Sequence, residues 1–178
     1  MLRGRQRWQA RVAGTTSPPK TRRRSLLSCG PEETRAFGEA LGRCLRPGDL
    51  LLLEGPLGAG KTCLAQGVAV GLGVRDYVKS PSFTLVNEYR SAAGFPLIHI
   101  DLYRIAAPEE VYSLGLDEYL VGNGVCIVEW AERAASVFPP EYLRIVFTMR
   151  AGNRRTLILR PRGQRYESMV EELSCSWP

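Results

Sequence analysis

Residues 50–62 read Leu-Leu-Leu-Leu-Glu-Gly-Pro-Leu-Gly-Ala-Gly-Lys-Thr, and this stretch decides the fold. Four consecutive leucines are typical of a strand that is buried on both faces of a mostly parallel sheet. Residues 55–62 then satisfy the pattern G-x-x-x-x-G-K-[ST], in which a glycine-rich loop joins such a strand to a helix. A buried strand, a glycine loop and a helix in this order predict a phosphate-binding loop.

The residue types in this loop suit phosphate for separate reasons. Glycines let the backbone curl so that successive N–H groups point at phosphate oxygens, and the helix that begins near Lys61 adds its positive end. Lys61 supplies a positive charge to the outer phosphates, and the Thr62 hydroxyl is a ligand for Mg²⁺. The sequence therefore predicts a nucleotide site that also holds magnesium.

Two carboxylates follow other apolar runs. Asp101 comes after residues 97–100, and Glu129 comes after residues 125–128. Open α/β sheets bind ligands at the carboxyl ends of their strands, so both acids are candidates for the metal side of the site. One would hold Mg²⁺ through water and the other would position or activate the attacking water, and the residues leave this assignment open.

Three hydroxyl residues and two ring residues are further candidates. Ser80, Ser82 and Thr84 lie on a proline-containing loop after the helix, where a switch that senses a γ-phosphate would lie. Trp130 suits either stacking on a nucleotide or partner, or a place in the core. His99 is the only histidine, and its apolar neighbours favour a structural interpretation.

Strand-like and helix-like segments alternate along the rest of the chain. Strands are predicted at 24–30, 50–53, 83–90, 96–104, 124–130, 142–150 and 154–161, and helices at 30–45, 61–73, 107–120 with a break near Gly115, 131–138 and the C-terminus. The pairs 83–90 with 96–104 and 142–150 with 154–161 are expected to be antiparallel. The pattern predicts an α/β, three-layer P-loop NTPase-like domain with a mostly parallel central sheet and some antiparallel strands.

The net charge of +6 is concentrated at the N-terminus. Residues 1–24 carry eight basic residues and no acid, which leaves 16 basic against 18 acidic residues in the rest. The basic character is therefore not a domain-wide nucleic-acid footprint. We expect residues 1–24 to be a disordered extension, with contact to RNA or acidic surfaces and an organelle transit peptide as alternatives, and residues 25–178 to form one domain.

Composition excludes several classes of protein. The basic segment lacks the apolar region of a secretory signal, and no apolar run approaches about 18 residues, so neither secretion nor a membrane partner is expected. The five cysteines are odd in number and include no C-x-x-C pair, which argues against a disulfide framework or a zinc site. A reducing compartment, in practice the cytoplasm, fits this usage.

Five segments together, in order and spacing, resemble the TsaE (YjeE) family. They are GDLLLLEGPLGAGKT at 48–62, VKSPSFTLVNEY at 78–89, HIDLYRI at 99–105, LGLDEYL at 114–120 and VEWAER at 128–133. The resemblance covers about residues 28–160. It implies a small P-loop ATPase of bacterial tRNA threonylcarbamoyladenosine synthesis, whose partners are the TsaD and TsaB proteins.

The resemblance also implies a division of labour. The TsaD–TsaB complex transfers threonylcarbamoyl from its adenylate to N6 of the adenosine beside the anticodon in tRNAs that read ANN codons. ATP hydrolysis by the TsaE-like protein resets that complex between turnovers and does not catalyse the transfer. Contact with tRNA would therefore be indirect, through the complex.

Motif and resemblance together give the candidate residues. Asp101 matches the Walker-B-like metal carboxylate of the family, Glu129 and Trp130 match its Glu-Trp pair, and Ser82 matches its switch hydroxyl. The expected catalytic residues are Lys61, Asp101 and Glu129, and the expected Mg²⁺ ligands are Thr62, Asp101 and Glu129. The expected ATP-binding residues are Gly55, Leu57, Gly58, Ala59, Gly60, Lys61, Thr62, Cys63, Ser82 and Trp130.

Three positions depart from the family pattern. Pro56 stands where Asp or Asn is usual and removes one N–H, with a small expected effect. Ser82 replaces the usual Thr and keeps the hydroxyl. Cys63 stands where a second hydroxyl residue often contacts the nucleotide, so we expect either weaker nucleotide binding or sensitivity to oxidation.

Three other functions compete with an ATPase. A small-molecule P-loop kinase is the main alternative, but residues 106–120 contain no Arg or Lys for the usual basic lid. A GTPase lacks support because no N-K-x-D motif occurs, and a nucleotide-binding scaffold without turnover stays open. Arg104 is the only nearby candidate for an arginine finger, which predicts weak hydrolysis that partners stimulate.

Overall fold

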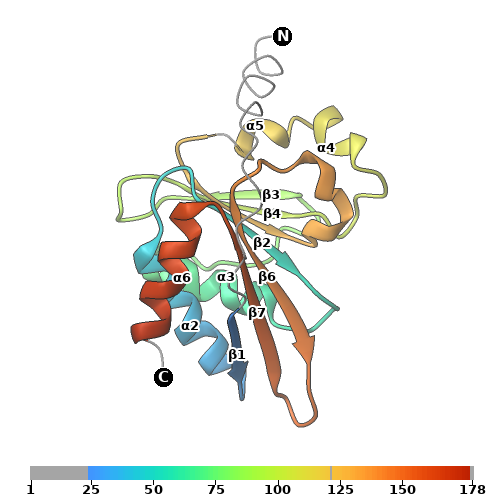
Figure 1. Ribbon diagram of the computed structural model, residues 1–178. Helices are drawn as coiled ribbons and strands as arrows, with labels where there is room; N and C mark the ends of the chain where they lie inside the picture. The colour runs from blue at the N-terminus through green and yellow to red at the C-terminus, as the bar shows by residue number, and fades with distance from the viewer. Residues whose placement is uncertain (1–23, 121, 177–178) are drawn as a thin grey trace.

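The computed structural model describes residues 24–120 and 122–176 (Figure 1). The basic segment 1–23 lies outside the described residues, so the disorder expected for it stays a prediction. The described chain opens with strand β1 at Arg24, where the sequence predicts the first strand.

A seven-stranded sheet forms the centre, in the order β1-β7-β6-β2-β5-β4-β3. Its middle strands β6, β2, β5 and β4 are parallel, whereas β1 with β7, β6 with β7 and β3 with β4 pair antiparallel. This confirms the predicted mixed sheet. The strands are β1 (Arg24–Ser28), β2 (Leu50–Glu54), β3 (Val86–Tyr89), β4 (Leu97–Asp101), β5 (Val125–Glu129), β6 (Tyr142–Met149) and β7 (Arg155–Arg162).

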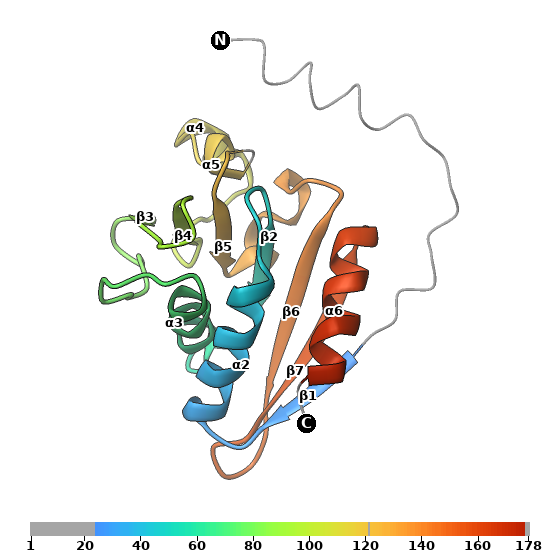
Figure 2. The ribbon, with the colours of Figure 1, turned by 90° about the vertical axis from the view of Figure 1, so that its left-hand side faces the viewer.

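Helices cover both faces of this sheet, which confirms the three-layer prediction. Leu51 and Leu53 pack in a core with α2, α3 and α6, and Leu50 and Leu52 pack in a second core with the helices of the other face. Two views place α4 and α5 away from α2 and α6 (Figures 1 and 2). The helices are α2 (Pro31–Cys44), α3 (Lys61–Gly71), α4 (Glu109–Ser113), α5 (Asp117–Leu120), the 3₁₀ helix η1 (Ala131–Val137) and α6 (Gln164–Ser176).

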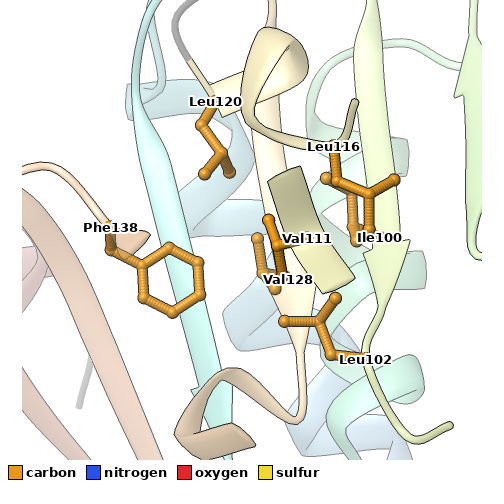
Figure 3. A pocket seen from close by; sticks show the side chains of 7 residues that line it. All are labelled: Ile100, Leu102, Val111, Leu116, Leu120, Val128 and Phe138. Carbon is orange, nitrogen blue, oxygen red and sulfur yellow. The ribbon is translucent and has the colours of Figure 1, made fainter. Parts of the chain in front are cut away.

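The second core contains a small apolar cavity of about 10 Å³ (Figure 3). A space of this size is at the lower limit for one water molecule, which would also need polar partners. The space is too small for an organic ligand. Its lining residues are Ile100, Leu102, Val111, Leu116, Leu120, Val128 and Phe138.

Helices α2 and α3 touch through their backbones. A Cβ atom on Gly67 would lie 2.1 Å from the Arg35 carbonyl oxygen, and one on Gly38 would lie 2.4 Å from the Leu64 carbonyl oxygen. Gly42 and Gly71 make equally close approaches one turn further along. The sequence analysis did not predict this contact, which involves α3, the helix that follows the glycine-rich loop at residues 55–60. We call these four residues the glycine seam.

Gly67→Ala is expected to lower the free energy of unfolding by about 3 kcal/mol, because the added methyl group forces the two helix backbones apart. In a chain of this size, that corresponds to a fall in Tm of roughly 6–12 °C. Thermal unfolding measured by circular dichroism checks this. Val70→Ala changes an exposed residue on the same helix and is the control, with an expected loss of less than about 1 kcal/mol. Equal Tm values for both variants would contradict the seam.

Candidate functional site

Backbone conformation explains the glycines of the loop between β2 and α3. Gly55, Gly58 and Gly60 have φ angles of +137°, +76° and +104°, which side chains disfavour. A Cβ on Gly55 would also lie 2.8 Å from the Phe147 carbonyl oxygen. The loop therefore turns tightly and delivers the first turn of α3, starting at Lys61, to the carboxyl edge of the sheet.

Lys61 is buried at this edge. Its ammonium donates hydrogen bonds to the carbonyl oxygens of Gly55 (2.7 Å) and Pro56 (3.0 Å). Burial lowers the pKa of Lys61, while Glu129, Glu132 and Asp101 act to raise it. A lysine that is partly desolvated and still surrounded by carboxylates is a strong local point charge for an anion.

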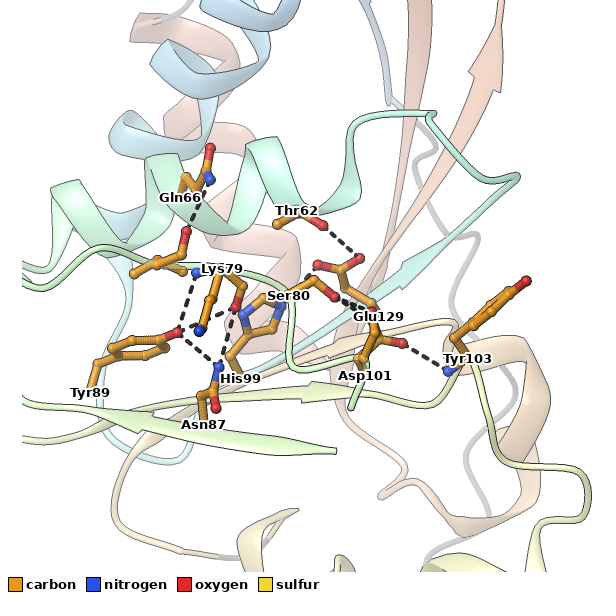
Figure 4. Close-up of polar contacts among 12 residues, drawn as sticks. Thr62, Gln66, Lys79, Ser80, Asn87, Tyr89, His99, Asp101, Tyr103 and Glu129 are labelled. Atoms are coloured by element: carbon orange, nitrogen blue, oxygen red, sulfur yellow. Dashed lines mark hydrogen bonds and ion pairs between the residues drawn. The ribbon is translucent and has the colours of Figure 1, made fainter. Parts of the chain in front are cut away.

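Glu129 connects three elements. Its Oε2 accepts a hydrogen bond from the Thr62 hydroxyl on α3 at 3.1 Å, and its Oε1 lies 2.9 Å from Nε2 of His99 on β4. Figure 4 shows the carboxylate between these two residues. Glu129 is opposite Asp101 in the parallel pairing of β4 and β5, so the two predicted carboxylates do lie side by side.

Asp101 is held by the loop that precedes β3. Its Oδ2 accepts hydrogen bonds from the hydroxyls of Ser82 (2.7 Å) and Ser80, and its Oδ1 accepts one from the Tyr103 backbone N–H (2.8 Å). The hydroxyl of Thr84 contacts the Asn87 side chain instead. Two of the three hydroxyls singled out by sequence therefore reach a candidate carboxylate, and the third does not.

Trp130 is partly buried, packs against the second core and also lies beside Lys61. Its ring centroid lies 3.7 Å from Lys61 Nζ and 5.0 Å from the Tyr103 ring centroid. Its backbone is left-handed, with φ +59°, a conformation that costs a bulky residue about 1–3 kcal/mol. The strain coincides with the position that brings the indole over the lysine.

Three contacts escaped the sequence analysis. His99 is buried as expected of a structural residue, yet its Nε2 contacts Glu129. Arg104 stacks over the Phe83 ring at 4.3 Å, and a second arginine, Arg155, lies near the loop. A Cβ on Gly60 would be 3.2 Å from Arg155 Nη1. No local motif marks Arg155, because only the pairing of β7 in the sheet brings it there.

Cys63 points away from the carboxylates. Its thiol donates to the Pro31 carbonyl oxygen at 3.0 Å. Burial raises the pKa of Cys63, although Arg35 and Arg155 act to lower it. Of the other candidate residues in the loop, Leu57 is largely exposed and Ala59 is buried.

Clusters of three or more His, Cys, Asp and Glu side chains that would suit a metal ion do not occur within residues 24–120 and 122–176. A magnesium ion held by one or two carboxylates, a hydroxyl and nucleotide phosphates does not require such a cluster. Over the same ranges, every helix is too short or too polar to cross a membrane.

A family model described as "Threonylcarbamoyl adenosine biosynthesis protein TsaE" matches residues 29–157, a range that contains every candidate residue above. The chain belongs to the TsaE family. A Bacillus subtilis (strain 168) protein named tRNA threonylcarbamoyladenosine biosynthesis protein TsaE is 45% identical over 144 residues, covering 81% of this chain and 89% of that protein. The protein of the same name from Treponema pallidum (strain Nichols) is 38% identical over 133 residues, covering 74% and 97%.

A solved structure agrees with this membership. The crystal structure of Bacillus subtilis YdiB superposes on this TsaE-family chain with a TM-score of 0.76 and 39% identity. The match covers 88% of this chain and 97% of YdiB. The α/β fold with a mixed sheet is therefore common to both.

Proposed function

We propose that this TsaE-family chain is an Mg-ATP-binding, weakly hydrolysing P-loop ATPase that supports a TsaD–TsaB complex. That complex would form N6-threonylcarbamoyladenosine next to the anticodon of tRNAs that read ANN codons. One observation carries the proposal beyond family membership: Thr62, at the start of α3, donates a hydrogen bond to the Glu129 carboxylate at the end of the adjacent strand, and the charge of Glu129 acts on the neighbouring Lys61. The site would act in the cytoplasm and reach tRNA only through the complex.

The donor set fits magnesium and a nucleoside triphosphate. Thr62, Glu129 and Asp101 offer only oxygen atoms, which Mg²⁺ prefers over nitrogen and sulfur. Lys61 and the loop from Gly55 to Gly60 would hold the phosphates. A bound Mg²⁺ would neutralise part of the negative charge of the phosphates.

The contacts favour different tasks for the two carboxylates. Glu129 accepts the hydroxyl hydrogen of Thr62, the residue expected at the metal, so we assign Glu129 to the metal side. Asp101 accepts hydroxyl hydrogens from Ser80 and Ser82, so we assign it to the loop that responds to the terminal phosphate. This favours Glu129 over Asp101 for the Walker-B-like role, the reverse of what the resemblance implies.

The contacts of the nearby arginines support the proposal of weak hydrolysis in isolation. Arg104 is stacked on Phe83, and Arg155 is anchored by the Asn153 carbonyl oxygen (2.8 Å) and the Thr34 hydroxyl (3.4 Å). Both guanidinium groups are engaged with other groups of the chain. A partner that supplies or redirects a positive charge would raise turnover, since such a charge contributes about 10³-fold or more in related reactions.

The decisive experiment measures ATP hydrolysis with and without a TsaD–TsaB pair from the same source. We expect slow turnover alone and stimulation by the pair, with Lys61→Ala abolishing the stimulation. Vigorous hydrolysis by the isolated protein would contradict the partner requirement. ATP binding without stimulation would favour the small-molecule kinase alternative, to be examined with a panel of small hydroxyl acceptors.

Cys63→Thr is expected to increase ATP affinity about 2- to 10-fold, because it supplies one hydroxyl hydrogen bond near the first turn of α3. Titration with a fluorescent ATP analogue measures this. Peroxide should leave the affinity of the unmodified protein unchanged, because the raised pKa keeps the Cys63 thiol protonated at neutral pH and so unreactive. Equal affinities for the two proteins would refute the hydroxyl argument, and a peroxide effect that Cys63→Thr removes would refute the argument from the pKa.

A further inference from the structure

The only histidine of the chain lies in the middle of β4 with no exposed surface. Its Nε2 is 2.9 Å from Glu129 Oε1, and its Nδ1 is buried without a hydrogen-bond partner among the described residues. A carboxylate can only accept hydrogen bonds, so the ring donates through Nε2. His99 thus makes one polar contact with its side chain, and that contact is to a candidate catalytic residue.

Packing alone does not explain a histidine here. Burying an imidazole with an unpaired nitrogen costs free energy that an apolar side chain of similar size would not. The neighbouring strand positions are filled by apolar residues such as Leu97, Ile98 and Ile100, which are buried without that cost. What histidine adds at position 99 is the hydrogen bond to Glu129.

With that hydrogen bond, both oxygens of the Glu129 carboxylate have a hydrogen-bond partner. Thr62 contacts Oε2 from α3, and His99 contacts Oε1 from β4, so each oxygen of Glu129 is held from a different element (Figure 4). With both oxygens tied, the plane of the carboxylate is set. Residues that orient a metal-side carboxylate in this way affect metal affinity and activity without touching the metal.

We propose that His99 is a positioning residue that fixes the Glu129 carboxylate toward Thr62 and so sets the affinity of the site for Mg²⁺. The proposal rests on the proposed ATPase function. It assigns no proton transfer to His99, and the role requires only the N–H donor at Nε2 and its reach.

Two substitutions with side chains of similar length separate the effect of the N–H donor from the effect of packing. His99→Gln keeps an N–H donor close to the place of Nε2. His99→Met has similar length and an apolar, adaptable side chain, so it fills the buried space without a donor. Thermal unfolding is measured first, and we expect His99→Met to be at least as stable as His99→Gln.

The main readout is binding rather than turnover. A non-hydrolysable ATP analogue is titrated into each protein over a series of Mg²⁺ concentrations and in EDTA. For His99→Met, we expect the Mg²⁺ concentration for half-maximal tightening to rise about 10- to 100-fold, while affinity in EDTA stays within about threefold. His99→Gln should stay within about threefold of the unmodified protein in both conditions. Turnover with the TsaD–TsaB pair should fall in parallel for His99→Met only.

A double-mutant cycle tests whether His99 affects the Mg²⁺ dependence through Glu129. In a Glu129→Gln background, His99→Met should produce no further loss of Mg²⁺ dependence, because the charge that His99 positions is already gone. Additive losses would overturn the proposal. A Mg²⁺ dependence that is unchanged in His99→Met, or that is lost equally in both variants together with a lower Tm, would also overturn it and return His99 to a structural role.

The outcomes for the two proposals are distinguishable. An unmodified protein that binds no ATP analogue would overturn the proposed function, and this inference with it. An unmodified protein with normal Mg²⁺-dependent binding, together with a His99→Met variant that behaves identically, would overturn this inference alone. Should His99→Met fail to fold, His99→Leu takes its place in the same measurements.

Discussion

Lys61→Ala is expected to lower ATP turnover by roughly 10²- to 10³-fold and to weaken ATP binding. The ammonium is buried at the mouth of the loop, where surrounding carboxylates help keep it charged. Alanine removes that charge and leaves Glu129 and Asp101 facing incoming phosphates without compensation. Steady-state hydrolysis with the partner pair and titration of an ATP analogue measure the two consequences.

Lys79→Ala is the matched control for this prediction. Lys79 loses the same charge from an exposed position near the site, and its expected effect on turnover is less than about threefold. If Lys61→Ala kept unmodified turnover, the loop would not be the catalytic phosphate site. If Lys79→Ala caused an equal loss, overall charge rather than the position of Lys61 would explain the effect.

Glu129→Gln is expected to reduce turnover by about 10²- to 10⁴-fold, while affinity for the ATP analogue in EDTA changes by less than about threefold. The amide preserves the shape of the carboxylate and its capacity for hydrogen bonds to Thr62 and His99, so the fold should persist. It removes the negative charge of the carboxylate that we propose lies on the metal side of the site. It also removes the leading charge that raises the pKa of Lys61.

Glu132→Gln separates these two consequences of losing Glu129. Glu132 also acts to raise the pKa of Lys61, but it is exposed on η1, whereas the hydroxyl of Thr62 donates its hydrogen bond to Glu129. Its neutralisation should leave turnover within about threefold. Equal losses in the two variants would show that the protonation of Lys61, rather than the metal-side carboxylate, limits hydrolysis.

The strands and the loop were predictable because their signals are local. Four leucines in a row can be buried only by covering both faces of the sheet, and the glycine-lysine-threonine ending specifies the turn into α3 whatever surrounds it. The same holds for the acids at the ends of the apolar runs, since parallel strands place their carboxyl ends at one edge. The segment 131–138, predicted as a helix, contains the 3₁₀ helix η1 (Ala131–Val137), which is interrupted at Ala134, whose φ and ψ are not helical.

The remaining features depend on which strands become neighbours. The contact between His99 and Glu129 follows from the pairing of β4 with β5, and the approach of Arg155 to Gly60 follows from the place of β7 in the sheet. Neither strand pairing can be predicted from the residues in or near the loop at residues 55–60. The choice of Ser80 over Thr84 as a partner of Asp101 depends on the path of a loop, which propensities do not fix.

The glycine seam determines which parts of the site can respond to a ligand. At the four glycines of the seam, no side chain separates the backbones of α2 and α3. Sliding or rotation of α3 would therefore press one helix backbone against the other. Lys61 and Thr62 lie on the first turn of α3, so we expect their backbone positions to stay fixed when a ligand binds. A conformational change on ATP binding or cleavage would then occur in residues 79–85 and at Trp130. A partner that distinguishes the nucleotide states would have to bind where these residues reach the surface.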